Sequence, residues 1–307
     1  MTEGTLTKRR FTGLSAFPLT PQRDNRPDVA AFAALVASAA AADVDSIGAL
    51  GSTGSYAYLD RTGRARLAAA AVDAAGGVPV IVGVGAIGTA AVLRNTEDAA
   101  EAGAAGVLLA PVSYQPLRDE EVFGLFEDVA LRFPDLPVVL YDNPATTGFN
   151  FSTELHVRIA QLPNTASIKL GKLPDGARPA REYVEKLRSL VPQQVSIGIS
   201  GDGAAARGLI AGCEVWYSVL GGLFPGICRN ITARATAGDA GAALALSEEL
   251  AAVWELFARY GSFRVAAAIA ALSGVVDQDS VYAPVRPLSG PDRDAVAAAL
   301  ATVGRLR

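Results

Sequence analysis

The sequence predicts a (β/α)8 barrel followed by a helical C-terminal region. Three observations support this fold class: short aliphatic runs recur as far as Ser218, Ala-rich stretches with helical spacing separate them, and no strand-like run follows Pro225. Apolar strands that alternate with helices are typical of a parallel sheet covered on both faces. Eight such units favour a closed barrel, because open doubly wound sheets more often have about five to seven strands.

The first seven predicted strands begin about 27–34 residues apart, as successive βα units do, and the eighth follows sooner. The predicted strands are Phe11–Phe17, Asp45–Leu50, Pro79–Val84, Gly106–Ala110, Pro137–Tyr141, Thr165–Lys169, Val195–Ile199 and Glu214–Ser218. The helices predicted between the early strands include Pro27–Ala42, Arg61–Ala75, Thr89–Ala102 and Asp119–Arg132. The residues expected to cap helices are Asp28, Asp60, Thr89, Asp119, Ser152 and Asp202.

Beyond Pro225 the pattern is helical throughout. The predicted helices are Ile227–Thr236, Asp239–Arg259, Ser262–Leu272 and Pro291–Val303. We interpret the first as the eighth barrel helix and the others as a C-terminal appendage. The expected division therefore places the barrel through its eighth strand in residues 1–225, and the last barrel helix with the appendage in residues 226–307.

Composition excludes several classes of function. The 307 residues include one His and two Cys, one ligand short of the four that a structural zinc site needs. A formal charge of -4 gives no electrostatic footprint for nucleic acid. The uncharged stretch Ala74–Leu93 contains Pro79 and five glycines, which favour a buried strand flanked by turns over a membrane span. We therefore expect no metal, cofactor, nucleic acid or membrane partner. Because the N-terminus shows no apolar leader, we also expect a cytoplasmic protein.

One motif is open to a different interpretation. Gly83–Gly88 matches the GxGxxG pattern of dinucleotide-binding loops and lies between a predicted strand and a predicted helix. That pattern also requires an acidic residue about 20 positions later, at the end of the next strand. The next strand, Gly106–Ala110, has none. The glycines are therefore better explained by a tight turn at the barrel mouth, and an NAD-dependent enzyme is the weaker hypothesis.

The active site of a barrel lies at the carboxyl ends of its strands. The second strand leads into Gly51–Ser55, the fifth ends in Tyr141–Pro144 and the sixth ends at Lys169. A lysine between Ile168 and Leu170 is expected to face a poorly solvated pocket, where desolvation lowers the pKa of its amine and frees it to attack a carbonyl. Taken alone, such a lysine more often extends to solvent.

The neighbouring motifs give Lys169 its significance. The phenol of Tyr141 can relay protons in a chain that has only one histidine. The alternative explanation is structural, because aromatic residues are common at strand ends. The hydroxyls of the Gly51–Ser55 turn suit a carboxylate, although a single turn of this kind is usually only a turn. Lys172 is a rival nucleophile only if the predicted strand register is wrong.

These motifs, in this order and spacing, resemble the dihydrodipicolinate synthase / N-acetylneuraminate lyase superfamily. The similarity covers nearly the whole chain. The matching segments are Phe11–Gly13, Thr20-Pro21, Gly51–Gly54, Pro79–Gly85, Ala102–Gly106, Tyr141–Pro144, Ile168-Lys169, Ser200–Asp202 and Pro287-Leu288. The resemblance implies a class I mechanism, in which a pyruvate-type 2-oxo acid forms a Schiff base with Lys169 and reacts with an aldehyde. It also implies that the family is usually homotetrameric, and we expect a homotetramer or a homodimer here.

The resemblance assigns roles to further residues. Tyr141 and Ser52 would relay protons, and Ser52 and Thr53 would bind the carboxylate of the 2-oxo acid. The remaining positions expected at the substrate are Gly51, Gly54, Thr146 and Gly201. Ser113 aligns with a tyrosine that a neighbouring subunit lends to the relay, and Tyr114 replaces it only if the loop is shifted.

Departures from the family pattern concern the second substrate. Thr146 stands where the synthase has an arginine that grips the carboxylate of its aldehyde, Ser55 replaces a glutamate, and Leu170 replaces an acidic residue. They disfavour authentic dihydrodipicolinate synthesis and favour another acceptor aldehyde, or cleavage of a 2-oxo sugar acid. They also motivate an alternative of another class, a catalytically impaired protein that binds small acids as a sensor or regulatory subunit.

The remaining residues with reactive side chains are expected outside the site. His156 lies in a predicted helix on the barrel exterior, which indicates a surface or interface histidine. Cys213 and Cys228 lie in apolar runs and are expected to be inert packing residues. The Ser200–Gly203 loop has no nearby basic side chain before Arg207, so we interpret it as a wall of the oxo-acid pocket rather than a phosphate site.

Overall fold

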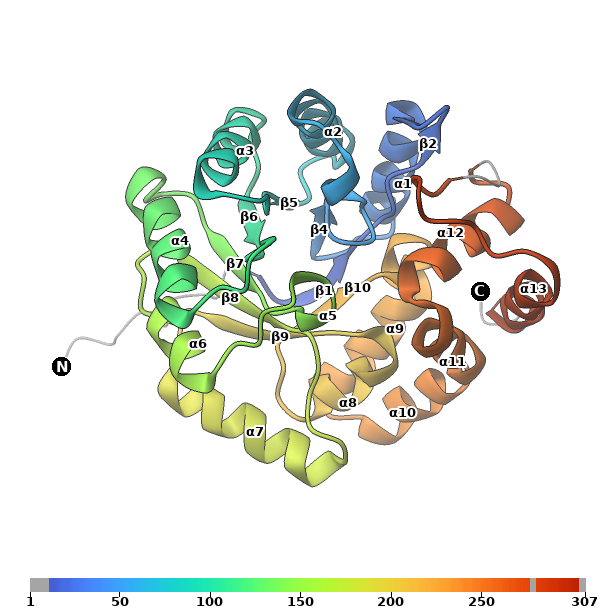
Figure 1. The fold of residues 1–307 in the computed structure, drawn as a ribbon. Helices are drawn as coiled ribbons and strands as arrows, with labels where there is room; N and C mark the ends of the chain where they lie inside the picture. Colours follow the sequence, from blue (N-terminus) through green and yellow to red (C-terminus); the bar gives the residue numbers. More distant parts are fainter. Residues whose placement is uncertain (1–10, 277–279, 304–307) are drawn as a thin grey trace.

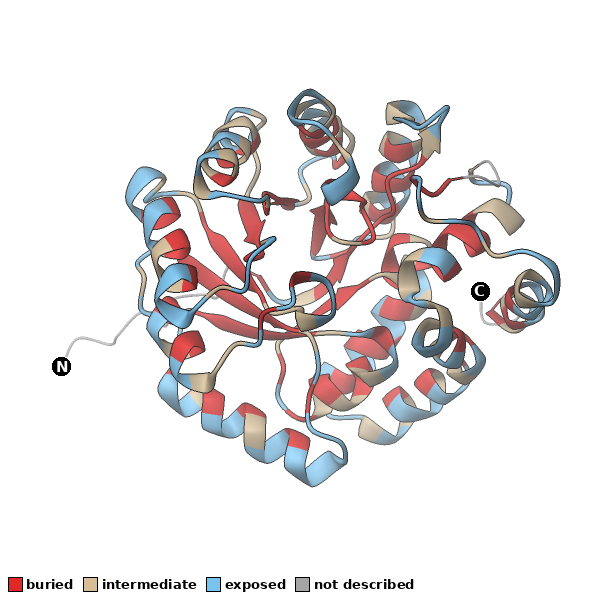
Figure 2. Ribbon diagram, in the orientation of Figure 1, coloured by how far each residue is buried: buried red, intermediate tan, exposed pale blue. Residues whose placement is uncertain are grey.

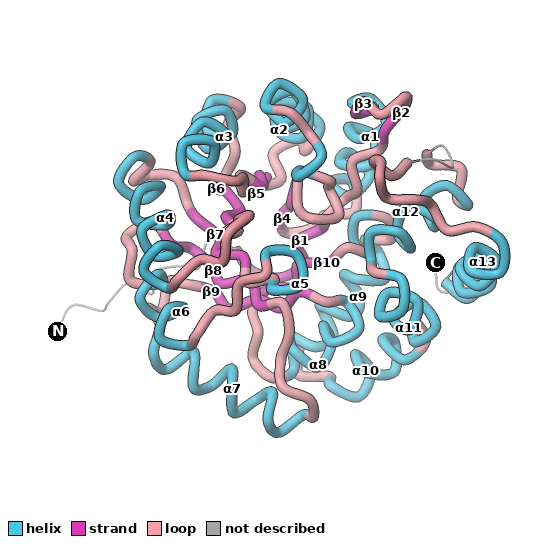
Figure 3. Tube along the Cα trace, viewed as in Figure 1, coloured by secondary structure: helices cyan, strands magenta, loops and turns pink. Residues whose placement is uncertain are grey.

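A closed barrel of eight parallel strands forms the centre of the molecule in the computed structural model, which describes residues 11–276 and 280–303 (Figure 1). Helices surround the strands, and the predicted fold class is confirmed. Around the barrel the strands follow the order β1-β10-β9-β8-β7-β6-β5-β4, and β1 pairs with β4 to close it. Figure 3 shows the strands at the centre, with the helices outside them.

The strands lie where the aliphatic runs predicted them. They are β1 (Gly13–Ala16), β4 (Ser46–Ala49), β5 (Val80–Gly83), β6 (Gly106–Leu109), β7 (Val138–Tyr141), β8 (Thr165–Leu170), β9 (Ser196–Ser200) and β10 (Val215–Ser218). A short hairpin outside the barrel joins β2 (Gln22–Arg23) to β3 (Arg26–Pro27). Nearly every barrel-strand residue is buried, as a sheet covered on its outer face by helices requires (Figure 2).

The helices follow the predicted order with local differences. Those around the barrel are α1 (Val29–Ala41), α2 (Arg61–Ala74), α3 (Thr89–Glu101), α4 (Asp119–Arg132), α5 (Pro144–Thr147), α6 (Thr153–Ala160), α7 (Ala177–Leu190), α8 (Ala205–Ile210) and α9 (Pro225–Thr236). Those that follow are α10 (Ala240–Glu248), α11 (Ala251–Tyr260), α12 (Ser262–Leu272) and α13 (Gly290–Val303). The segment predicted as one helix over Asp239–Arg259 is therefore two helices, which meet at Glu249 and Leu250.

Three of the six predicted caps are confirmed. The side chains of Asp28, Asp60 and Ser152 accept hydrogen bonds from the first turns of α1, α2 and α6. The other three predictions are wrong. Thr89 and Asp119 are the first helical residues of α3 and α4, after caps at Gly88 and Arg118. The carboxylate of Asp202 bonds instead to groups on and after β10, as described below.

Two glycines in the strands make room for aromatic rings at the mouth of the barrel. A Cβ atom on Gly48 of β4 would lie 2.1 Å from the ring of Phe17, and one on Gly198 of β9 would lie 2.4 Å from the ring of Tyr217. Any larger residue would therefore displace these rings. Phe17 and Tyr217 pack edge to face, with ring centroids 5.8 Å apart.

The C-terminal helices lie at one side of the barrel (Figure 1). Ala270 of α12 packs with Leu35 of α1, which fixes α12 to the barrel wall. Helix α11 packs against α12, α13 and the 3-10 turn η2 (Asp202–Ala204) that follows β9. This contact brings α11 to the carboxyl ends of the strands. Helix α9 begins at Pro225, and the domain division at that residue stays a prediction.

No helix within the described residues is both long enough and apolar enough to span a bilayer.

Candidate active site

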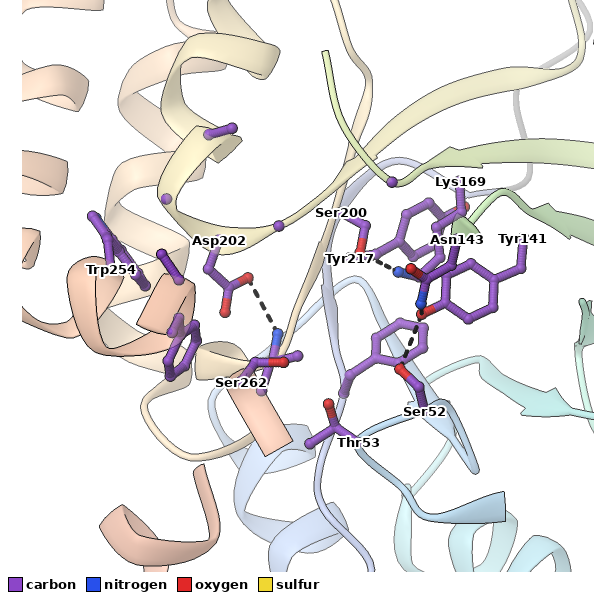
Figure 4. Close-up of a pocket in the computed structure, with 18 residues that line it drawn as sticks. Ser52, Thr53, Tyr141, Asn143, Lys169, Ser200, Asp202, Tyr217, Trp254 and Ser262 are labelled. Atoms are coloured by element: carbon purple, nitrogen blue, oxygen red, sulfur yellow. Dashed lines mark hydrogen bonds between the residues drawn. The ribbon is translucent and has the colours of Figure 1, made fainter. Parts of the chain in front are cut away.

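A cavity of about 370 Å³ opens at the carboxyl ends of the barrel strands (Figure 4). Residues from the strand ends form one side of it, and residues from α11 and α12 form the other. Its lining residues are Phe17, Ser52, Thr53, Tyr141, Asn143, Lys169, Gly171, Ser200, Gly201, Asp202, Gly203, Ala204, Tyr217, Val219, Trp254, Phe257, Ala258 and Ser262. The three motifs that the sequence singled out therefore meet in one place.

Lys169 lies between two neighbouring strands in this cavity. It pairs with Tyr141 on β7 and with Gly198 on β9, and only 3% of its surface is exposed. Three aromatic rings surround its Nζ atom, at 4.3 Å from the ring centre of Tyr141, 5.2 Å from that of Phe17 and 5.4 Å from that of Tyr217. Nζ donates a hydrogen bond of 2.5 Å to Oγ of Ser200.

Burial governs the charge of this amine. Desolvation lowers the pKa of Lys169 from 10.5 to about 7, and the carboxylate of Asp202 opposes this by raising it. The aromatic faces attract the ammonium form but do not replace its hydration. The neutral, nucleophilic form of the amine is therefore accessible near neutral pH.

Tyr141 connects this amine to the Gly51–Ser55 turn. Its hydroxyl lies 3.0 Å from Oγ of Ser52 and accepts a hydrogen bond of 2.7 Å from Nδ2 of Asn143. Burial raises the pKa of Tyr141, and its hydrogen bonds with Ser52 and Asn143 oppose that rise. The phenol therefore stays protonated at neutral pH and has partners on both sides, the arrangement that a proton relay needs.

The Gly51–Ser55 turn presents its hydroxyls to the cavity through an unusual backbone. Leu50 and Ser55, at its two ends, adopt positive φ angles of 56° and 59°. Ser52 and the buried Thr53 line the cavity. Gly51 and Gly54 do not line it. A Cβ atom on Gly51 would lie 2.8 Å from the ring of Phe17, and a Cβ atom on Gly54 would lie 2.9 Å from the backbone nitrogen of Gly51. These glycines shape the turn, and their role in binding substrate stays a prediction.

Asp202 is a site residue that sequence reasoning did not assign. Its carboxylate accepts hydrogen bonds from Nε1 of Trp216 at 2.8 Å and from the backbone N–H of Val219 at 3.2 Å and of Leu220 at 2.7 Å. Burial raises the pKa of Asp202, and these hydrogen bonds oppose the rise. The side chain joins the end of β9 to the loop after β10. A signal was available, because Asp202 closely follows β9 at the carboxyl end of the barrel, where the site residues of this fold lie.

Other predicted residues lie at different distances from the cavity. Gly201, with a φ of 88°, lines it. Thr146 is exposed and outside the lining; its hydroxyl donates to the backbone oxygen of Asn143 at 3.3 Å. Ser113 and Tyr114 line a separate cavity of about 400 Å³, and Tyr114 is 86% exposed. The substrate contact of Thr146 and the second-subunit contribution of Ser113 or Tyr114 stay predictions.

The prediction that His156 is a surface or interface residue is wrong. Only 1% of its surface is exposed, its ring stacks on Phe151, and its Nε2 lies 3.2 Å from Oδ2 of Asp142. Helix α6 turns this side chain inward, toward the segment that follows β7. The helical pattern placed His156 on a helix but did not show that the Phe149–Phe151 segment covers it.

Two further predictions concern residues outside the cavity. The rival Lys172 is exposed and does not line it, so the predicted register at Lys169 holds. Cys213 and Cys228 are buried free thiols, and burial raises the pKa of both. Their raised pKa values leave them protonated and unreactive at neutral pH.

Packing explains two of the three glycines of the Gly83–Gly88 motif, and the third, Gly88, adopts a positive φ of 84°. A Cβ atom on Gly83 would lie 1.9 Å from the backbone oxygen of Leu50, and one on Gly85 would lie 3.1 Å from that of Ala110. Arg64 donates to the backbone oxygens of both glycines at 2.9 Å. Within the part of the chain that the structure describes, no three His, Cys, Asp or Glu side chains gather as metal ligands.

Comparisons with known proteins give a consistent result. A model of the dihydrodipicolinate synthetase family matches residues 10–303. The 4-hydroxy-tetrahydrodipicolinate synthase of Methylobacterium radiotolerans is 28% identical, and the alignment covers 100% of this chain and 99% of that protein.

Solved structures agree with this match. A dihydrodipicolinate synthase from Agrobacterium tumefaciens superposes with a TM-score of 0.92 at 40% identity, covering 96% of this chain and 98% of that one. A putative dihydrodipicolinate synthetase from Pseudomonas aeruginosa gives a TM-score of 0.88 at 27% identity, covering 95% and 99%. The predicted superfamily is confirmed, and the broad enzyme class, an aldolase-type lyase, is supported.

Proposed function

Because the chain belongs to the dihydrodipicolinate synthetase family, we propose that it is a class I lyase or aldolase in which Nζ of Lys169 forms a Schiff base with a pyruvate-type 2-oxo acid. One observation carries the proposal. A lysine with a pKa near 7 lies buried among aromatic rings in a cavity, next to the hydrogen-bonded hydroxyl of Tyr141. Structural lysines do not require a depressed pKa, whereas nucleophilic amines do.

The first step joins the amine to the oxo acid. Neutral Nζ of Lys169 attacks C2 of the oxo acid and forms an N–C bond, while the carbonyl oxygen takes a proton and becomes the hydroxyl of a carbinolamine. Tyr141 supplies that proton and recovers one from the nitrogen through Ser52, whose Oγ lies 3.0 Å from the phenol oxygen. Tyr141 then donates the recovered proton to this hydroxyl, which leaves as water and yields the protonated Schiff base.

The turn after β4 orients the oxo acid. The hydroxyls of Ser52 and Thr53 line the cavity beside Tyr141, where they can donate to the carboxylate of a substrate attached to Lys169. The carboxylate and the positively charged Schiff base nitrogen then lie close together and stabilise each other. Gly201 and the end of β9 form the adjoining wall.

The carbon–carbon step needs no external oxidant or reductant. Loss of a proton from C3 converts the Schiff base to an enamine, and C3 then attacks the carbonyl carbon of an aldehyde, whose oxygen is protonated. Water hydrolyses the resulting Schiff base, which releases the product and restores Lys169. Read in reverse, the same steps cleave a 4-hydroxy-2-oxo acid.

We also propose that the enzyme is cytoplasmic and forms a homotetramer or homodimer.

Trapping with borohydride tests the proposal. Borohydride reduces a Schiff base to a stable amine, so treatment in the presence of pyruvate should add a three-carbon carboxyethyl group to the peptide that contains Lys169. Peptide mass spectrometry locates the adduct, and a Lys169→Ala variant should carry none. If pyruvate binds the native protein without any such adduct, the small-acid-binding alternative suggested by Ser55, Thr146 and Leu170 is correct instead.

A further inference from the structure

Helix α11 forms a wall of the cavity that faces the strand ends. Trp254, Phe257 and Ala258 of α11 line this wall, and Ser262, the first residue of α12, adjoins it. Figure 4 shows Trp254 and Ser262 on the opposite side of the cavity from Lys169 and Tyr141. If the first substrate binds at Lys169, the second substrate would therefore lie against this wall.

Contacts with neighbouring elements fix the indole of Trp254 at this wall. Its Nε1 donates to the backbone oxygen of Ser247 at 2.8 Å, so the polar group of the ring is satisfied within the protein. A Cβ atom on Gly203 would lie 3.1 Å from Cβ of Trp254, which shows how closely α11 approaches the loop after β9. Phe257 packs at 63° to the indole with ring centroids 5.9 Å apart. Both aromatic residues are only half-buried and offer apolar surface to the cavity.

The charges in the cavity favour a neutral second substrate. Among the described residues that line the cavity, Lys169 and Asp202 are the two with an ionisable side chain, apart from the tyrosines. Lys169 becomes the Schiff base nitrogen, already paired with the carboxylate of the oxo acid, and Asp202 repels anions. Thr146, where the family resemblance implies an arginine for an acidic aldehyde, is exposed and outside the lining. An aldehyde with its own carboxylate would therefore lose hydration without gaining a cation.

We propose that the second substrate is an aromatic aldehyde without a carboxylate, whose ring packs against Trp254 and Phe257. The proposal rests on the proposed Schiff base chemistry at Lys169 and adds the class of the acceptor. The aldehyde carbon would point toward Lys169, and its ring would cover the apolar surface of α11. In the cleavage direction, the same wall would bind the aromatic end of a 4-hydroxy-2-oxo acid.

The test compares aldehydes matched in shape. The rate of aldol formation from pyruvate is measured with benzaldehyde, acetaldehyde, 4-carboxybenzaldehyde and 4-formylbenzamide, the last having nearly the same shape as the acid without its charge. We expect kcat/KM for 4-formylbenzamide to exceed that for 4-carboxybenzaldehyde about 100-fold. We expect kcat/KM for benzaldehyde to exceed that for acetaldehyde by about 10-fold or more, because the ring adds buried apolar surface.

Variants of Trp254 test the wall itself. Trp254→Ala should lower kcat/KM for benzaldehyde about 10-fold or more and change that for acetaldehyde by less than about 2-fold. Trp254→Phe should retain most of the activity with benzaldehyde. Borohydride trapping of pyruvate on Lys169 should be unchanged in both variants, which shows that the fold and the first half of the site are intact.

Each other outcome has a definite meaning. Equal rates with the amide and the acid, equal losses for both aldehydes in Trp254→Ala, or no turnover of any aldehyde while pyruvate is still trapped would overturn the assignment of the second substrate alone. Failure to trap pyruvate on Lys169 of the unaltered protein would overturn the proposed function and, with it, this inference.

Discussion

The two walls of the cavity differ in origin and in chemistry. The strand-end wall, which contains Ser52, Thr53, Tyr141 and Lys169, combines hydroxyls, a phenol and an amine. These residues lie at or just after the ends of β4, β7 and β8. The α11 wall is mostly apolar and comes from residues about 85 positions after Lys169. The first is suited to form and break bonds, and the second is suited to select what enters. Under the proposed function, reaction class and substrate choice would therefore reside in separate parts of this chain.

Removing the nucleophile should have the largest effect. Lys169→Ala eliminates the only amine among the described residues that line the cavity, so we expect turnover with pyruvate to fall about 10⁴-fold or more. Lys172→Ala is the matched control, because this exposed lysine lies three residues away and outside the cavity. Steady-state assays of both variants measure the two losses of turnover. Equal losses in Lys169→Ala and Lys172→Ala, or activity that survives in Lys169→Ala, would show that Lys169 is not the nucleophile.

Removing the phenol should have the next largest effect. Tyr141→Phe deletes the hydroxyl that bonds to Ser52 and Asn143 and leaves the ring beside Lys169 in place. We expect kcat to fall about 100-fold or more with an unchanged melting temperature, since a proton-transfer group is lost and little packing changes. Single-turnover kinetics and thermal unfolding measure the two quantities. Unchanged rates would rule out the relay.

The pH dependence of trapping reports the charge on Lys169. Because the pKa of Lys169 is lowered to about 7, the rate of pyruvate trapping should rise with pH below about 7 and level off above it. Asp202 raises that pKa, so Asp202→Asn should move the midpoint to lower pH. Trapping rates between pH 5 and 9 give both midpoints. A midpoint near 10 in the unaltered protein would show that burial does not activate the amine.

The smallest expected effect is on stability. The pKa of Lys169 is 10.5 when unperturbed and about 7 in the folded protein. Burial of the ammonium therefore lowers the free energy of unfolding by its full amount below pH 7. This destabilisation disappears as the pH rises from 7 toward 10.5, because the folded protein then holds the neutral amine. Lys169→Met should accordingly raise the melting temperature at pH 6, by roughly 7 °C, and the gain should shrink by pH 9. A gain that does not vary with pH would point to packing rather than charge.

Sequence predicted the strand-end wall because its determinants are local. A strand end fixes the position of a side chain in a barrel, so Tyr141 and Lys169, on neighbouring strands, had to meet once the fold class was known. The family resemblance then supplied roles for Ser52 and Thr53. The structure adds the surroundings, such as Gly48 and Gly198, whose missing side chains admit the aromatic rings around Lys169.

The α11 wall was not predictable, because its position depends on how separate helices pack. Asp239–Arg259 reads as a single helix, and the break near Leu250 that turns α11 toward the cavity has no strong breaker residue. Trp254 then appears as an ordinary helical aromatic. The wrong prediction for His156 has the same cause: periodicity places a residue on a helix but does not identify the loop that covers it.

A crystal structure of the protein soaked with pyruvate tests the central claim most directly. We predict a covalent bond between Nζ of Lys169 and C2 of the ligand, with the ligand's carboxylate within hydrogen-bond distance of the hydroxyls of Ser52 and Thr53. Pyruvate bound without that bond, or bound with its carboxylate against the α11 wall, would contradict the account.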